Sequence, residues 1–207
     1  MIAIVDYDAG NIKSVEKALL CQGQEVVITR DPDKILNAGG VILPGVGAFG
    51  DAMKKLHTYH LTEVIRECVR KGTPFLGICL GLQLLFESSE ESPGVEGLHI
   101  LDGKILRIPS GQGLKIPHIG WNNLYFPKRG RLFEGISAES AYVYFVHSYY
   151  LQAADEGIVT AAAEYGVSIH ASVEKGNVFA CQFHPEKSSD VGMKILQNFI
   201  RVCEGTL

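Results

Sequence analysis

The sequence predicts an α/β protein: a mostly parallel sheet flanked by helices, with antiparallel strands added in the second half. In the first 80 residues, short apolar runs alternate with amphipathic segments of helical period. After about residue 100, β-rich segments follow one another between Gly, Pro and Asn turns, and little helix is expected before residue 188. Apolar strands alternating with amphipathic helices are typical of parallel sheets that are covered on both faces.

The first half contains strands and helices in alternation, with glycines at the predicted helix ends. The helices are expected at 11–22, before Gly23, and at 61–71, before Gly72. The strands are expected at Ile2–Val5, Val26–Thr29, Val41–Leu43 and Pro74–Ile78.

The second half is predicted to add strands and a last helix, Ser188–Cys203, to the same sheet. No Gly/Ser/Pro linker separates the two halves, so we expect residues 1–207 to form a single domain. The strands are expected at Lys104–Ile108, Leu124–Phe126, Tyr142–Val146, Val159–Glu164 and Val178–Phe183.

Composition and charge exclude several classes of protein. The chain is 46% hydrophobic and 20% charged, and its net charge of −4 without a Lys/Arg run argues against nucleic acid as a partner. No stretch approaches the roughly 20 apolar residues that span a bilayer, and the N-terminus lacks the features of a signal peptide. The 5 scattered cysteines include no CxxC pair, which indicates a reduced, cytoplasmic protein. No His or Cys spacing predicts a metal site, and no cofactor is expected.

A candidate nucleophile, Cys79, stands where the predicted strand 74–78 turns into the next helix. Gly77 and Gly81 flank it, as in the cysteine version of a nucleophile elbow, and leave room for a tight turn. The following helix N-terminus favours thiolate over thiol. The amide of Leu80 is then a natural donor to an oxyanion.

A candidate base, His184, ends the last predicted strand, and Glu186 follows it after Pro185. In an extended segment, residues two apart point to the same side, so the carboxylate can accept from one ring nitrogen while the other faces Cys79. His147, at another strand end, is a lower-ranked alternative.

The glycine-rich segment 43–50 follows a strand and precedes a helix. Its spacing matches neither dinucleotide-binding nor P-loop motifs. We interpret it as backbone that lies close to a substrate and donates an amide near Val46, and a strained turn that needs glycine explains the pattern equally well.

Taken together, GICLGLQLLF and FHPEKSS resemble the motifs of the class I (triad) glutamine amidotransferases, whose sheet is flavodoxin-like. The resemblance implies a glutaminase with Cys79, His184 and Glu186 as the triad and the amides of Val46 and Leu80 as the oxyanion hole. It also implies that L-glutamine is held by Gly45, Gly47, Gln83, His147, Ser148 and Tyr149.

Within this family, PGVGAFGDAM, EESPGVEGL, PHIGWN and YFVHSYY are similar to the glutaminase subunits of imidazole glycerol phosphate synthases, in histidine biosynthesis. That similarity implies a heterodimer in which a (β/α)8-barrel cyclase subunit accepts the ammonia. Candidate contact residues are Asn11, His118, Trp121 and Asn122, with an exposed Trp121 as an anchor or, equally, a core tryptophan.

Two other functions remain open from the sequence. One is a triad glutaminase that serves another synthase, of the anthranilate, purine or pyridoxal type. The other is a flavodoxin-like cysteine hydrolase or redox sensor without glutaminase activity, which would use Cys79 without His184 or Glu186.

Overall fold

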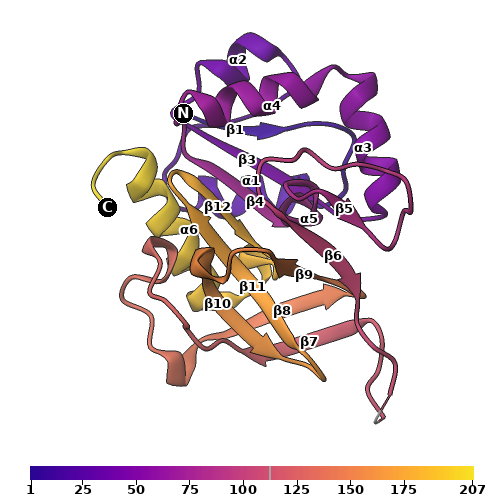
Figure 1. Ribbon diagram of the computed structural model, residues 1–207. Coiled ribbons are helices and arrows are strands. Elements are labelled where there is room, and N and C mark those ends of the chain that lie inside the picture. The colour runs from indigo at the N-terminus through magenta and orange to yellow at the C-terminus, as the bar shows by residue number, and fades with distance from the viewer. Residues whose placement is uncertain (112) are drawn as a thin grey trace.

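A seven-stranded sheet forms the centre of the computed structural model, which describes residues 1–111 and 113–207 (Figure 1). The strand order is β10-β11-β12-β4-β3-β1-β2, parallel from β12 to β2 and antiparallel at β10 and β11. This confirms the predicted α/β class and the antiparallel addition to a flavodoxin-like sheet. The strands are β1 (Ile2–Val5), β2 (Val26–Thr29), β3 (Gly40–Gly45), β4 (Phe75–Cys79), β10 (Val159–Glu164), β11 (Ser168–Lys175) and β12 (Val178–Cys181).

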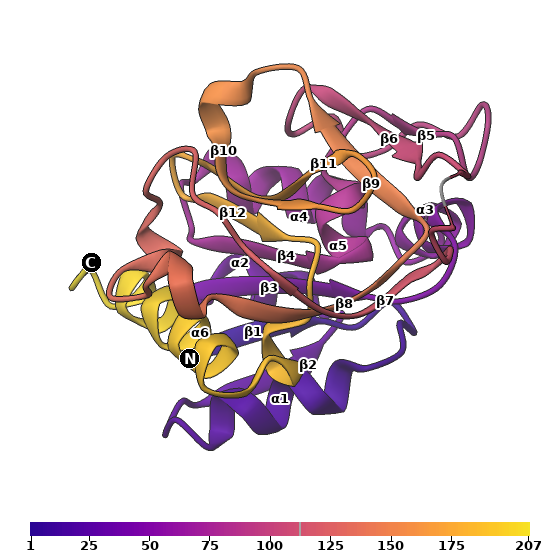
Figure 2. The same cartoon turned by 90° about the horizontal axis from the view of Figure 1, so that it is seen from below.

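Helices cover both faces of this sheet, because its strands are apolar on both sides. Ile2 and Ile4 of β1 belong to one buried cluster, and Ala3 and Val5 belong to the other. Seen from below, α1 and α6 lie on one side of the sheet, and α3, α4 and α5 lie on the other (Figure 2). The helices are α1 (Ile12–Leu20), α2 (Pro32–Leu36), α3 (Phe49–Thr58), α4 (Leu61–Arg70), α5 (Leu80–Leu84) and α6 (Ser189–Cys203).

Two smaller sheets complete the fold. One joins β5 (Ser88–Ser89), β6 (Gly103–Arg107) and β9 (Tyr149–Ala153), and the other pairs β7 (His118–Asn123) with β8 (Tyr142–His147). The predicted strand Leu124–Phe126 is wrong: Tyr125 forms only an isolated bridge with Ala162. Pro127 follows directly and has no N–H with which to extend a ladder.

The sequence did not predict β7, β9 or β11, and the predicted strand 178–183 ends early, at Cys181. The predicted helix stops are confirmed at Gly23 and Gly72, which both adopt positive φ just beyond α1 and α4.

Two further features concern the cysteines and the helices in the described part of the chain. All of the cysteines are free there. None of the helices in residues 1–111 and 113–207 is long and apolar enough to cross a membrane.

Candidate active site

The candidate site lies at the carboxyl edge of the main sheet, where β3, β4 and β12 end side by side. Gly45 of β3 is in register with Cys79 of β4, and Cys181 of β12 is in register with Ile78. Because these strands are parallel, the segments that follow all three emerge at one edge. The topology therefore brings the turn at Cys79, the glycine-rich segment and the segment with His184 together.

Cys79 sits on a strained strand-to-helix turn between β4 and α5. Its backbone has φ 55° and ψ −108°, a conformation that a non-glycine residue adopts at a cost of about 1–3 kcal/mol. The flanking glycines allow this turn by close packing. A Cβ on Gly81 would lie 1.8 Å from the carbonyl oxygen of Leu43, and one on Gly77 would lie 2.7 Å from that of Gly81.

His184 and Glu186 form a buried pair. Nδ1 of His184 lies 2.7 Å from Oε1 of Glu186, and the side chains are only 1% and 0% exposed. The same Oε1 accepts a hydrogen bond from Nδ2 of Asn11, which also lies 3.5 Å from the histidine Nδ1. Asn11, expected at a partner surface, therefore contacts this pair directly.

The surroundings of His184 favour its charged form. Burial alone would lower its pKa, but the interactions with Cys79 and with Glu186 outweigh burial and raise the pKa from 6.5 to about 9. Nε2 of His184 makes no hydrogen bond of good geometry to any described residue. Cys79 therefore raises the pKa of His184 by electrostatic attraction of the charged ring. Nδ1 is engaged by Glu186, which leaves Nε2 for chemistry.

Strand β8 holds the segment that carries His184. The backbone N–H of His184 donates to the carbonyl of Tyr144, at 3.0 Å, and the hydroxyl of Ser188 donates to the carbonyl of His184, at 2.6 Å. The same hydroxyl oxygen accepts from the N–H of Tyr144, at 3.0 Å. The turn at Pro185–Lys187 is therefore fastened at both ends, which fixes the direction of the imidazole.

A cavity of about 390 Å³ opens beside Cys79. It is lined by most of the residues predicted to hold a substrate. It also includes Glu91, which lies in the segment EESPGVEGL but was not among the predicted substrate-binding residues. Gly45 lies in β3 beside Cys79. The lining residues are Val46, Gly47, Cys79, Leu80, Gln83, Glu91, Pro117, Val146, His147, Ser148 and Tyr149.

His147 lines this cavity, but both of its ring nitrogens are already engaged. Nδ1 lies 2.9 Å from the carbonyl oxygen of Tyr149, and Nε2 lies 3.1 Å from Nδ1 of His118. Burial lowers the pKa of His147 to about 3. A ring with these contacts is a poor proton acceptor for Cys79, so the geometry favours His184 as the base over the alternative histidine.

The residues of β7 that were expected at a partner surface differ in exposure. Trp121 is 54% exposed and Ile119 is 59% exposed, on one face of the strand, so Trp121 is not a core tryptophan in this chain. His118 points the other way: it is buried and stacked between Phe145 and Tyr165. Its side chain therefore offers no free surface in this chain.

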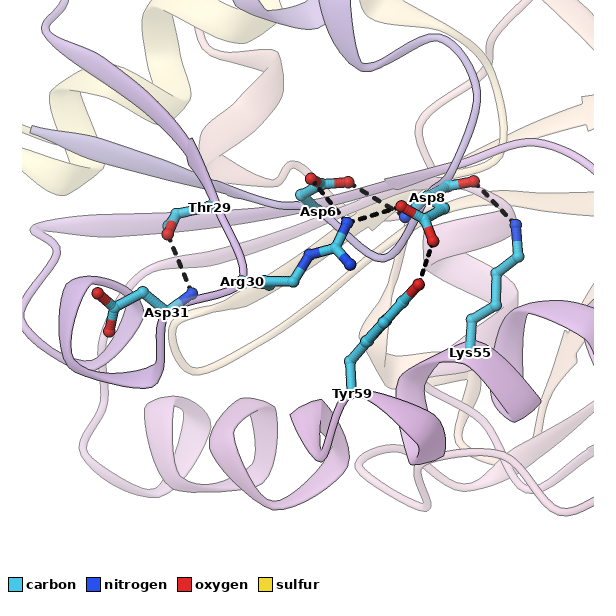
Figure 3. Close-up of polar contacts among 7 residues, drawn as sticks. All are labelled: Asp6, Asp8, Thr29, Arg30, Asp31, Lys55 and Tyr59. Atoms are coloured by element: carbon cyan, nitrogen blue, oxygen red, sulfur yellow. Dashed lines mark hydrogen bonds and ion pairs between the residues drawn. The ribbon is translucent and has the colours of Figure 1, made fainter.

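An ion network fixes the loop between β1 and α1, which carries the Asn11 described above (Figure 3). Arg30 reaches Asp6 at 3.0 Å and Asp8 at 2.6 Å. From α3, Lys55 donates to the carbonyl of Asp8 at 2.9 Å, and the hydroxyl of Tyr59 donates to its carboxylate. These contacts tie the β1–α1 loop to the end of β2 and to α3, and no motif in the sequence predicted them.

Comparison with known proteins places this geometry in a family. The family model for glutamine amidotransferase class-I matches residues 3–203. A relative from Moorella thermoacetica, "Imidazole glycerol phosphate synthase subunit HisH", is 52% identical and covers 96% of this chain and 93% of its own length. A protein of the same description from Aquifex aeolicus is 50% identical, covering 97% and 96%.

Among solved structures, one described as "Crystal structure of glutamine amidotransferase" superimposes with a TM-score of 0.77. It is 21% identical and covers 99% of this chain and 100% of its own, which shows that the fold is shared. With a family model over nearly all of the sequence and relatives at about half identity, the chain belongs to the class I glutamine amidotransferases.

Proposed function

We propose that this chain is the glutaminase subunit of an imidazole glycerol phosphate synthase, which hydrolyses L-glutamine to glutamate and ammonia. The full-length similarity to relatives of that description supports the assignment. The observation that carries the chemistry is the strained Cys79 beside the buried His184–Glu186 pair, at the wall of a substrate-sized cavity.

The proposed reaction proceeds through a thioester. The Cys79 thiolate attacks the side-chain amide carbon of glutamine, and the amides at Val46 and Leu80 donate to the oxyanion. His184, held protonated by its neighbours, gives its proton to the amide nitrogen as the C–N bond breaks, so that the nitrogen leaves as ammonia. Water activated by His184 then cleaves the thioester, which releases glutamate and restores Cys79.

We assign glutamine binding to Gly45, Gly47, Gln83, His147, Ser148 and Tyr149. Gln83 supports this role because its Nε2 is used within the protein, by the carbonyl of Tyr149 and by Gln182. Its carbonyl oxygen remains for a ligand N–H.

Glu91 adds a charge that suits the substrate's α-ammonium group. One carboxylate oxygen accepts from the N–H of Phe49, at 2.8 Å, which holds the side chain at the cavity wall. In Glu91→Gln we expect KM for glutamine to rise about tenfold with kcat little changed, because the lost ion pair acts on ground state and transition state alike. Steady-state kinetics of the complex test this, and an unchanged KM would remove Glu91 from the binding site.

The partner in this proposal is a (β/α)8-barrel cyclase subunit that forms a heterodimer with this chain and accepts the ammonia. Asn11, Trp121 and Asn122 are the proposed contact residues, with His118 supporting β7 from its inner face. The exposed aromatic ring of Trp121 suits an interface anchor. We further propose that residues 1–207 act as one domain in the cytoplasm and need no cofactor.

Glutamate release from glutamine, by the chain alone and with the cyclase subunit plus its nucleotide ligand, tests this function. We expect slow hydrolysis by the isolated chain and strong stimulation in the complex, because Val46 and Gly47 are exposed at the cavity wall, where docking can reorient their backbone. Equal rates in both conditions would contradict activation by the partner, and no hydrolysis in any mixture would contradict the assignment.

A further inference from the structure

Gln182, which no motif singled out, lies directly behind the proposed nucleophile. We infer that Gln182 is a further catalytic residue, whose side-chain N–H donates to Sγ of Cys79 and stabilises the thiolate before attack. Nε2 of Gln182 lies 3.8 Å from that sulfur, and Gln182 is 0% exposed, so water does not compete for the contact. The inference rests on the proposed role of Cys79 as nucleophile.

The orientation of the Gln182 amide follows from its neighbours. The carbonyl of Tyr149 can only accept a hydrogen bond, so the atom of Gln83 that lies 3.0 Å from it must be the nitrogen. The same nitrogen lies 3.1 Å from Gln182, whose facing atom must therefore be the oxygen. The NH₂ group of Gln182 is then the one directed at Cys79.

A buried histidine pair donates to the same Tyr149 carbonyl. His147 donates from Nδ1 to the Tyr149 carbonyl, so its Nε2 must accept from Nδ1 of His118. Burial lowers the pKa of His147 to about 3 and that of His118 to about 4. Both rings are therefore neutral at physiological pH. The Tyr149 carbonyl accepts from both His147 and Gln83, and beyond it Gln83 donates to Gln182, which donates to the sulfur.

Other groups near the sulfur contribute in other ways. His184, paired with Glu186, supplies the opposite charge. The hydroxyl of Tyr7 donates to the carbonyl of Pro44, and the thiol of Cys181 donates to that of Phe183. Burial, and then charge on Cys79, raises the pKa of Tyr7, and burial raises that of Cys181, so both stay neutral. Gln182 provides the directed neutral N–H.

The test is the pH dependence of Cys79 alkylation by iodoacetamide in the isolated chain, followed by mass spectrometry of the Cys79 peptide. In Gln182→Met, which keeps a similar length but has no N–H, we expect the midpoint to move up by about one pH unit. The glutaminase rate of the complex should fall about tenfold near pH 7 and recover as the pH is raised. An unchanged midpoint would overturn the inference.

Two further variants keep the test decisive. Gln182→Leu likewise removes the N–H without adding a charge, so the same upward shift is expected, and it gives the answer if the Met variant does not fold. Asn198→Leu removes another fully buried amide, which bonds the carbonyls of Leu132 and Glu134. It should lower thermal stability and leave the Cys79 midpoint in place, and an equal shift there would refute a specific role for Gln182.

The two proposals fail in different ways. If Cys79→Ala retained glutaminase activity, the proposed function would fall. If Cys79 proved essential while the Gln182 variants alkylated like the wild type, only this inference would fall.

Discussion

Replacing Cys79 by alanine is expected to lower glutamine-dependent turnover by at least about 10⁴-fold, because no other group can form the thioester. The strained turn should persist or relax slightly, since alanine is smaller than cysteine and Cys79 is 6% exposed. The cyclase partner should still use added ammonia at its normal rate. Turnover with glutamine and with ammonium salt, measured on the same complex, checks both expectations.

Cys68→Ala is the matched control, since it removes a buried thiol on α4. Cys68 belongs to one of the two buried clusters, and Cys79 belongs to the other. It should cost some thermal stability and leave glutamine hydrolysis intact. Glutamate release at the wild-type rate by the Cys79 variant would show that another group is the nucleophile.

Replacing Glu186 by glutamine should lower the glutaminase rate roughly 10³-fold while keeping the shape of the site. The glutamine side chain can still accept from His184 and Asn11, but the negative charge that favours the imidazolium is gone. The pKa of His184 should then fall from its value of about 9.

This shift predicts the direction of the pH profile. His184 must be protonated to give its proton to the leaving amide nitrogen, so the alkaline limb of the residual activity should move to lower pH in Glu186→Gln. Glu174→Gln is the control: it weakens the ion pair between Glu174, on β11, and Arg131, and should reduce stability only. An unshifted profile in Glu186→Gln would mean that the carboxylate does not act through His184.

Local signals in the sequence were sufficient for much of the fold. Val159–Glu164 was predicted with the bounds that β10 has, and α4 and α6 begin within a residue of prediction, because periodicity and glycine stops are local. Strand β7 was missed because its run of Gly120, Asn122 and Asn123 has low strand propensity. It forms through pairing with β8, a contact between distant segments.

The sequence by itself determined the elbow around Cys79 and the neighbouring His184–Glu186 pair, because short-range geometry specifies both: flanking glycines for the turn, and a spacing of two for the pair. Only the tertiary structure decided which side chains surround them. The contacts of Asn11 with Glu186, and of Gln182 with Cys79, join residues 175 and 103 positions apart. Such contacts depend on which strands lie side by side and on where each buried polar group finds its partner, and no local pattern encodes either.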